Sequence, residues 1–399
     1  VLDKVFIENV QVYPDVENKS VDLKVTLCKR AAGDIETELK VSVPGKETKT
    51  TQVNINDDLQ EFDLRYPMGD NVKFWDEFTP DLYDLSVKVK AGKYIDRKTV
   101  RFGMRSFEDD GHCVKINGRP TFLRGTLECC IFPISGHPAT DKTEWLRIMK
   151  TLKSYGLNHL RFHSWCPPEA AFKAADELGI YLQPELPVWV KDFGQNELRD
   201  KFIVKEAHRI LKEYGNHPSF VMFSLGNELK GDFSFNHELV NKLKQKDSRH
   251  LYTSTTYSFQ GKHGRRPEKV DDFFISQRTT KGWIRGQGFF NERKPSTEFD
   301  FSSSLKGIDV PVISHEIGQY SVYPNMKEIK KYTGVNDPVN FKAVRDDLER
   351  KGMLELADQY LQASGQLSAL LYKADIELCM RSIGMSGFQL LDLHDFPGQ

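Results

Sequence analysis

Hydrophobic and polar residues alternate with period two through most of the N-terminal quarter of the chain. Valine and leucine take every second position in residues 21–27, 39–43 and 85–89, and turn-rich stretches at 17–20 and 67–70 divide such runs. Successive side chains of a strand point to opposite faces, so this pattern predicts strands with one buried face. Short strands separated by turns are typical of an antiparallel β-sandwich.

The pattern becomes helical further along the chain. Asn117 and Gly118 lie between two short apolar runs and predict a tight hairpin turn. Asp141 and Glu144 have the spacing of a helix capping box, and apolar residues follow at helical spacing over 145–155. We expect a helix there that ends at Gly156.

Strand-like and helix-like segments alternate from this point to the end. Helices are expected at 167–178 and 197–214, and strands at 121–124, 157–162, 180–182, 220–225, 251–255, 273–276, 310–314 and 385–391. Eight strands over about 280 residues predict a (β/α)8 barrel, which typically needs about 250. A doubly wound sheet is the alternative, although no GxGxxG turn follows the first strand to support its nucleotide-binding form.

Composition narrows the classes of partner. The chain has 399 residues with 56 Lys and Arg, 57 Asp and Glu, and a net charge of −1. No single-sign field is expected, which argues against nucleic acid or a membrane as the main partner. Six cysteines are too few for a disulfide scaffold of this length. The sequence does not decide whether the protein is cytoplasmic, periplasmic or secreted in a bacterium. It does not decide whether the chain forms a homo-oligomer either.

The active site of a (β/α)8 barrel lies at the carboxyl ends of its strands, where several reactive side chains are expected. They are Arg161, His163 and Trp165 after the second strand, Glu185 and Trp189 after the third, Asn227 and Glu228 after the fourth, His315 and Glu316 after the seventh, and Asp392, His394 and Asp395 after the eighth.

Carboxylates at different strand ends suit glycoside hydrolysis if two of them face one cavity. One must hold a proton for the departing oxygen, while the other stays ionised to attack the sugar carbon or to activate water. Burial and like charge can push two such pKa values apart. A single glutamate at a strand end is more often solvated or ion-paired, so only a pair supports this chemistry.

Other chemistries find less support. His163, His315 and His394 have neither the HExxH nor the Cys/His spacing of a metal site, and hydrogen bonding to substrate or carboxylates is the expected role. No GxSxG elbow supports a serine triad. We expect no metal and no cofactor. Trp165, Trp189 and Trp283 fall in predicted loops, where stacking on a sugar and packing within the loop are both open.

Several segments resemble glycoside hydrolase family 2, which includes β-galactosidases, β-glucuronidases and β-mannosidases. "PDLYDLSVKV" from Pro80 is similar to the end of its immunoglobulin-like domain, and "INGRPTFLRG" from Ile116 is similar to the start of its barrel. The most specific matches are "NHPSFVMFSLGNE" from Asn216 and "PVISHEIG" from Pro311. The resemblance implies an immunoglobulin-like β-sandwich at residues 1–106 and a catalytic TIM barrel at 107–399.

The resemblance also implies roles for particular residues. Glu316 takes the place of the nucleophile and Glu228 that of the general acid/base in a retaining mechanism. Asn227 would bind the sugar 2-hydroxyl, and Arg161 and His163 would orient the carboxylates. Carbohydrate is the implied partner, without nucleic acid or membrane.

The chain departs from the family pattern where the sugar would bind. Leu127 and Cys129 stand where many members have Asn and His, and neither 273–283 nor the last strand matches the familiar aromatic residues. Galactose is therefore only the default sugar. The remaining candidate substrate-binding residues are Glu185, Trp165, Trp283 and Asp392.

Two further readings stay open. A non-catalytic carbohydrate-binding protein or inactive fragment would keep the fold without turnover. An inverting hydrolase would place its carboxyl groups about 6.5 to 9.5 Å apart rather than about 5 to 5.5 Å. Family members usually carry a jelly-roll domain before the sandwich, so we expect a chain cut at both ends, with a barrel that lacks its last helix.

Overall fold

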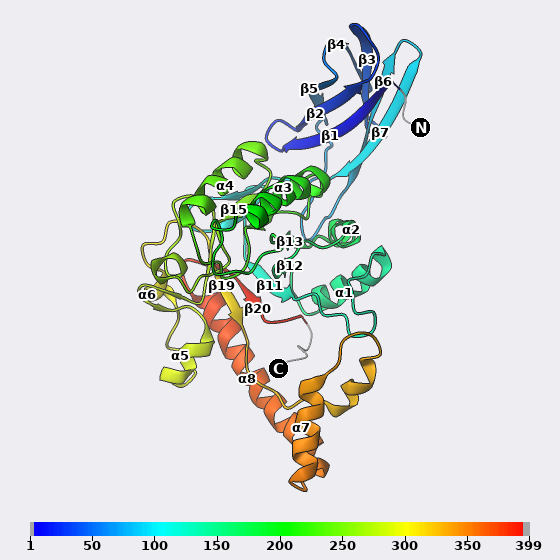
Figure 1. The fold of residues 1–399 in the computed structure, drawn as a ribbon. Helices are drawn as coiled ribbons and strands as arrows, with labels where there is room; N and C mark the ends of the chain where they lie inside the picture. The colour runs from blue at the N-terminus through cyan, green and yellow to red at the C-terminus, as the bar shows by residue number, and fades with distance from the viewer. Residues whose placement is uncertain (1–3, 394–399) are drawn as a thin grey trace.

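The computed structural model of the protein describes residues 4–393, and its N-terminal part is a sandwich of two antiparallel sheets (Figure 1). One sheet has the order β1 (Val5–Asp15), β2 (Ser20–Lys29), β5 (Leu59–Pro67), and the other has the order β4 (Lys49–Ile55), β3 (Ile35–Ser42), β6 (Tyr83–Ala91), β7 (Tyr94–Phe102). The predicted alternation is confirmed in β2, where Val21, Leu23 and Val25 are buried while Asp22 and Lys24 are exposed. Side chains from both sheets share one hydrophobic cluster, as a sandwich core requires.

A short three-stranded sheet follows the sandwich. It consists of β8 (Phe107–Asp109), β9 (Val114–Ile116) and β10 (Arg119–Thr121). The hairpin predicted between β9 and β10 is confirmed, and Asn117 and Gly118 have φ angles of 52° and 73°. Positive φ at both central residues is what a type I′ turn demands, which is why the Asn-Gly pair was informative.

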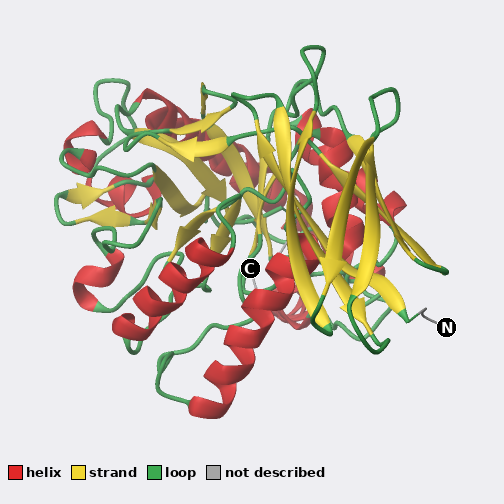
Figure 2. Cartoon of the chain, turned by 90° about the horizontal axis from the view of Figure 1, so that it is seen from above, coloured by secondary structure: helices red, strands yellow, loops and turns green. Residues whose placement is uncertain are grey.

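A curled parallel sheet forms the centre of the second part (Figure 2). Its six-stranded portion has the order β13 (Tyr181–Gln183), β12 (His159–Phe162), β11 (Leu123–Glu128), β20 (Met385–Leu390), β19 (Val312–Ile317), β16 (Phe274–Ser276), and β14 (Met222–Ser224) pairs separately with β15 (Leu251–Thr253). A bridge from Leu182 to Phe220 connects the β13 and β14 segments. On the other side, Asp272 N donates to Tyr252 O at 2.9 Å, beside β15 and β16. All eight predicted parallel strands thus overlap observed ones.

Helices lie outside the curled sheet and join its strands (Figures 1 and 2). They are α1 (Lys142–Ser154), α2 (Glu169–Leu178), α3 (Glu197–Tyr214), α4 (Phe233–Lys246), α5 (Gly286–Glu292), α6 (Ser302–Leu305), α7 (Val339–Arg350) and α8 (Ala357–Arg381). Asp141 caps α1 by accepting from Glu144 N at 3.1 Å, as its spacing predicted. Short 3-10 turns lie at Gly261–Gly264, Met326–Lys331 and Leu354–Leu356, and β17 (Arg278–Thr279) pairs with β18 (Gly282–Trp283).

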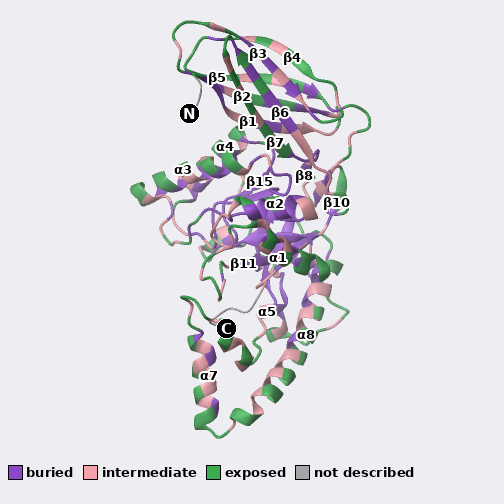
Figure 3. Ribbon diagram, turned by 90° about the vertical axis from the view of Figure 1, so that its right-hand side faces the viewer, coloured by how far each residue is buried: buried purple, intermediate pink, exposed green. Residues whose placement is uncertain are grey.

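The longest helix, α8, has no clear hydrophobic stripe. Over its 25 residues only Ser368, Asp375, Leu378 and Cys379 are buried, whereas Leu370 is 66% exposed. Together with α7 it projects away from the sandwich (Figure 3). Within residues 4–393, none of the helices has both the length and the apolar content that crossing a bilayer needs.

A buried arginine connects the sandwich to the curled sheet. Arg249 lies just before β15, pairs with Asp247, and donates from Nη1 to Val12 O at 2.9 Å and from Nη2 to Gln11 Oε1 at 2.7 Å. Its guanidinium also stacks over the ring of Tyr13 at 4.4 Å. One side chain thereby satisfies polar groups of β1 and fixes that strand against the β14–β15 region.

We expect Arg249→Met to lower the free energy of unfolding by about 3 kcal/mol, because it leaves the Asp247 carboxylate buried without its partner. Urea unfolding followed by circular dichroism measures the change. Arg147→Met is the matched control: it removes an exposed arginine that pairs with Glu144 on α1, where a change below about 1 kcal/mol is expected. Equal effects of the two substitutions would contradict this account.

Candidate active site

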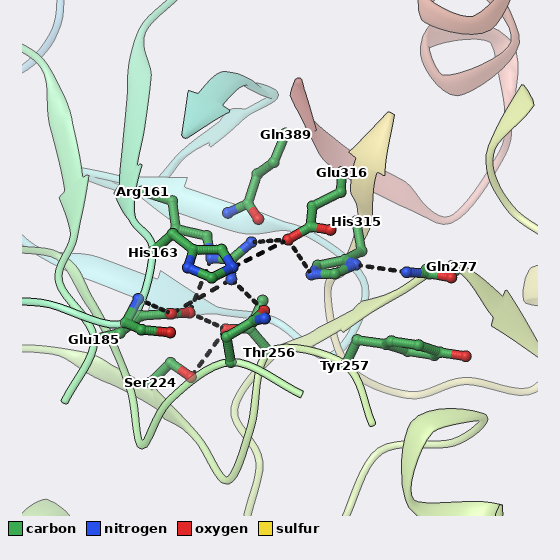
Figure 4. A network of polar contacts seen from close by, with 12 residues as sticks. Arg161, His163, Glu185, Ser224, Thr256, Tyr257, Gln277, His315, Glu316 and Gln389 are labelled. Atoms are coloured by element: carbon green, nitrogen blue, oxygen red, sulfur yellow. Dashed lines mark hydrogen bonds and ion pairs between the residues drawn. The ribbon is translucent and has the colours of Figure 1, made fainter. Parts of the chain in front are cut away.

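Five predicted residues lie at the carboxyl ends of the parallel strands, and Figure 4 labels three of them, Arg161, Glu185 and Glu316. Arg161 lies in β12, Glu185 follows β13, Asn227 and Glu228 follow β14, and Glu316 lies in β19. Carboxyl ends of neighbouring parallel strands meet at one rim, so residues far apart in sequence become neighbours there. Of the five, all are buried except Glu228, which is partly exposed.

Arg161 contacts three other residues of this group. Its Nε donates to Glu185 Oε1 at 2.8 Å, and its Nη2 donates to Asn227 Oδ1 at 2.6 Å. Its Nη1 lies 3.3 Å from Glu316 Oε1. Arg161 has no exposed surface, so these acceptors must replace water around its charge. The rigid fork of the guanidinium therefore fixes three strand ends relative to one another.

Glu316 is kept ionised. Burial alone would raise its pKa, but the positive groups around it outweigh burial and hold the pKa well below its usual value. His315 Nε2 and His163 Nε2 lie 3.2 Å and 3.7 Å from Glu316 Oε1. Burial lowers the pKa of His315 to about 4, so at neutral pH Arg161 supplies the permanent charge.

Glu228 is in the opposite state. Burial, followed by the nearby charge of Glu316, raises the pKa of Glu228 to about 7. One carboxylate oxygen of each residue and a ring nitrogen of His315 all lie within 4.8 Å of one another. Below about pH 7 the two neighbouring carboxyl groups thus differ in charge, since Glu316 is ionised while Glu228 is mostly protonated.

The same three groups could offer ligands to a cation. Glu228, His315 and Glu316 form the one candidate metal cluster found among residues 4–393. The guanidinium of Arg161 already lies against Glu316, however, and would repel a divalent ion at that oxygen. A proton shared unequally between two carboxyl groups therefore fits these residues better than a metal.

Both carboxyl residues have left-handed backbones. The φ angle is 48° at Glu228 and 51° at Glu316, a region that side chains other than glycine seldom adopt. Glu228 N donates to Thr256 O at 2.9 Å, which helps to hold this conformation. Unfavourable backbone conformations that the surrounding structure maintains tend to occur at functional sites.

Sequence reasoning missed two residues that support the site. Thr256 Oγ1 donates to Glu185 Oε1, and Gln277 Nε2 lies 3.2 Å from His315 Nδ1 (Figure 4). Both directly follow predicted strands, 251–255 and 273–276. Position was thus the available signal, but their uncharged side chains did not stand out in the search for ionisable groups.

Arg285 is a second buried cation near the carboxyl groups. Its charge acts on Glu228 and Glu316, yet its Nη1 contacts only the backbone oxygens of His315 and Glu316, each at 3.5 Å. Within the described part of the chain, its buried Nε has no hydrogen-bond partner. Gly286 N donates to Asp375 Oδ1 at 2.6 Å, which ties this loop to α8.

The predicted tryptophans have other contacts. Trp165 donates to Glu128 O at 3.1 Å and packs against Phe162 with ring centroids 5.2 Å apart. Trp283 donates to Glu292 Oε1 at 2.9 Å on the β17–β18 hairpin. Neither of these contacts involves Glu228 or Glu316, so a role for either tryptophan in sugar binding stays a prediction.

The residues after the last strand reach the site from β20. The charge of Asp392 raises the pKa of Cys129, after the larger effect of burial, and Arg161 and Glu316 also act on that thiol. Cys129, where the chain departs from the family pattern, therefore lies beside the carboxyl groups. The candidates His394 and Asp395 lie outside the described residues.

Comparisons with known proteins point to one family. The family model for glycosyl hydrolases family 2 matches residues 5–105. A putative β-glucuronidase of Formosa agariphila is 33% identical over 161 residues, 40% of this chain and 19% of that protein. A β-galactosidase of Thermoanaerobacterium thermosulfurigenes is 25% identical over 258 residues, 61% of this chain and 35% of that protein. These matches span roughly a fifth to a third of the relatives' length.

Solved structures resemble the fold over nearly the whole chain. A family 2 β-galacturonidase from Eisenbergiella tayi, bound to galacturonate, superposes with a TM-score of 0.73 over 98% of this chain and 65% of that one, at 14% identity. A Parabacteroides merdae β-glucuronidase reaches 0.65 over 98% of this chain and 47% of that one, at 17% identity. At such identities the likeness concerns the fold.

We expect Glu316→Gln to lower the pKa of Glu228 from about 7, yet to leave it above the usual 4.5, because the neighbouring charge is lost while burial remains. Nuclear magnetic resonance of the protein with 13C-labelled glutamate side chains would follow this titration. In Glu144→Gln, which removes an exposed carboxylate on α1, the pKa of Glu228 should stay at about 7. An unchanged pKa in Glu316→Gln would show that the two carboxyl groups do not interact.

Proposed function

We propose that this chain is a member of glycosyl hydrolases family 2 and that it hydrolyses a terminal β-linked sugar with retention of anomeric configuration. Glu316 is the proposed nucleophile and Glu228 the proposed general acid/base. One observation carries the proposal: two carboxyl groups with opposite pKa shifts approach within 4.8 Å. This separation favours a retaining reaction at about 5 to 5.5 Å over an inverting one, which needs room for water at about 6.5 to 9.5 Å.

In the first step, Glu316 attacks the anomeric carbon and the bond to the leaving group breaks. Its low pKa keeps the attacking oxygen ionised, and Glu228, protonated below about pH 7, gives its proton to the departing oxygen. Asn227, held by Arg161, is positioned to hydrogen-bond the sugar 2-hydroxyl, a contact that strengthens in the transition state.

In the second step, Glu228 acts as a base. Having lost its proton, it takes one from water, and the water oxygen attacks the anomeric carbon as the ester bond to Glu316 breaks. Esterification removes the negative charge of Glu316, which was the second cause of the raised pKa of Glu228. The proton affinity of Glu228 therefore falls and rises again in step with the reaction.

We also propose that the chain has the two-domain arrangement that its resemblance to glycoside hydrolase family 2 implied. Residues 1–106 would form the immunoglobulin-like sandwich and residues 107–399 the catalytic (β/α)8 barrel, with the curled sheet as its wall. Barrel geometry supports the proposed site, because the barrel's carboxyl ends are where Arg161, Asn227 and Glu316 gather. Glu185, His163 and the loop residues Trp165, Trp283 and Asp392 would complete the carbohydrate site.

Galactose is the default sugar, and a uronic acid is the second candidate. Arg285 favours the second, because its buried guanidinium, whose Nε lacks a partner among the described residues, could donate a hydrogen bond to the carboxylate of the sugar. Relatives of both kinds occur, including the β-galactosidase and the putative β-glucuronidase above. Hydrolysis of 4-nitrophenyl β-galactoside, β-glucuronide and β-galacturonide decides between them.

A non-catalytic carbohydrate-binding protein or an inactive fragment is the remaining alternative. It predicts that sugars bind without release of nitrophenol from any of the three glycosides. The opposed pKa shifts of Glu228 and Glu316 favour an enzyme, since binding alone does not require two carboxyl groups in different charge states.

We expect Glu316→Gln to lower kcat by at least about 10⁴-fold on every nitrophenyl glycoside that the protein cleaves, because no glycosyl-enzyme can form. Glu228→Gln should lower the rate by about 10²- to 10⁴-fold with a poor leaving group and much less with 2,4-dinitrophenol. A 2-fluoro glycoside should label Glu316, as mass spectrometry of the digest would show. Glu144→Gln serves as the control, and labelling of another carboxylate would refute the assignment.

The pH dependence should have its basic limb at about pH 7. Above that pH Glu228 loses the proton that the leaving group needs, so kcat/KM falls. The acid limb should lie far lower, since the pKa of Glu316 is well below its usual value. Dinitrophenyl glycosides should show a weaker basic limb because their leaving group needs less protonation. An identical basic limb for both substrates would contradict the acid role of Glu228.

A further inference from the structure

A separate pocket lies on the outer side of Glu228. It has a volume of about 380 Å³ and is lined by Trp189, Val190, Lys191, Glu228, Lys230 and Phe259. A carboxylate oxygen of Glu228 also lies within 4.8 Å of one of Glu316. The carboxyl group thus stands between the pocket and the nucleophile.

Three loops build the pocket and are hydrogen-bonded to one another. Lys230 N donates to Val190 O at 3.2 Å, which joins the loop after β14 to the loop after β13. Ser258 Oγ donates to Leu229 O at 2.7 Å, which adds the loop after β15. These two hydrogen bonds hold the three loops against one another.

Two aromatic rings face solvent on these walls. Trp189 is 60% exposed and Phe259 is 57% exposed, although neighbouring rings support both of them. The edge of Trp189 meets His163 with centroids 5.0 Å apart, and Phe259 meets Tyr257 at 4.9 Å. Large exposed rings beside a reactive carboxyl group are typical of a binding surface, and a ring face suits the apolar face of a sugar.

The pocket is also positively charged. Lys191 and Lys230 line it, and no ion pair to either is found in residues 4–393. Lys230 Nζ lies 5.6 Å from the centroid of Phe259, and its charge lowers the pKa of Glu228. Glu228 is the only carboxyl group of the lining and is largely protonated below pH 7. An anionic ligand would therefore meet two cations and little opposing charge.

We propose that this pocket binds the leaving-group portion of the substrate, and that it selects a saccharide carrying an anionic substituent. The inference rests on the proposed function, because it takes Glu228 as the acid that protonates the departing oxygen. That oxygen must lie within reach of Glu228, so the glycone lies toward Glu316 and the leaving group extends toward Trp189 and Phe259. Carboxylate and sulfate groups share the required charge.

The same pocket would hold an acceptor in the second step. A hydroxyl of the acceptor loses its proton to Glu228, and its oxygen bonds to the anomeric carbon. The bond from that carbon to Glu316 breaks, which returns the free carboxylate. Transfer to a sugar acceptor therefore reports on the pocket separately from cleavage of the first bond.

The aromatic walls are tested with two substrates of the same glycone. A glycosyl fluoride has a leaving group too small to fill the pocket, whereas a disaccharide fills it. In Trp189→Ala and in Phe259→Ala, kcat/KM for the disaccharide should fall about tenfold further than kcat/KM for the fluoride. Trp189→Phe should recover part of this loss. Tyr155→Ala, which removes an 81% exposed ring at the end of α1, is the matched control.

The cations are tested with acceptors. Glucose, glucuronic acid and glucose 6-sulfate are offered to the enzyme during turnover of the fluoride, and transfer products are quantified. The two acidic acceptors should be glycosylated at lower concentration than glucose. Lys191→Ala and Lys230→Ala should each reduce this preference severalfold, as should added salt, whereas Lys150→Ala on α1 should not. The carboxylate and sulfate arms identify which anion the pocket prefers.

The outcomes separate the two proposals. If the native protein cleaves neither the fluoride nor any nitrophenyl glycoside, the proposed function is wrong. If it cleaves the fluoride but the aromatic variants affect both substrates equally, or affect neither, the pocket does not bind the leaving group. Equal transfer to glucose and to the acidic acceptors would overturn the anionic selectivity.

Discussion

The buried guanidinium of Arg161 is the contact on which the site depends. It is sealed from water and must find all its acceptors among the protein groups around it, which are Glu185, Asn227 and Glu316. Each acceptor comes from a different strand end, so satisfying one charge brings those ends together. Thr256 Oγ1 and Ser164 N in turn donate to Glu185, so both of its carboxylate oxygens are hydrogen-bonded.

The same charge makes the pKa values of the two neighbouring carboxyl groups differ. Arg161 lies 3.3 Å from Glu316 and stabilises its anion. Within residues 4–393 no ion pair to Glu228 is found, and burial and the neighbouring anion outweigh the more distant charges of Arg161, Arg285 and Lys230, which raises its pKa to about 7. An asymmetric environment thus gives two identical side chains different chemistry. The aromatic rings and lysines that line the pocket lie next to Glu228, the proposed proton donor.

Hydrophobic periodicity predicted the helices and strands that bury one regular face. It did not predict α8. The strands around Val25 and Val87, the cap at Asp141 and the hairpin at Asn117 were readable because local spacing decides them. The helix α8 buries mostly small or polar residues such as Ser368 and Asp375, so no apolar stripe marked it. Position after a strand was likewise the only sign of Thr256, whose hydroxyl is unremarkable in sequence.

The sequence by itself determined which groups stand at the strand ends: an arginine near the end of one buried strand, an Asn-Glu pair after another, and a His-Glu pair near the end of a third. These follow from local pattern, because the chain order of strands and the residues after them are sequence properties. Only the tertiary structure decided their charge states and their grouping. A pKa depends on burial and on charges brought from 67 to 155 positions away, as between Arg161 and Glu228 or Glu316. The pocket of Trp189 and Phe259 likewise exists only because three separate loops hydrogen-bond to one another.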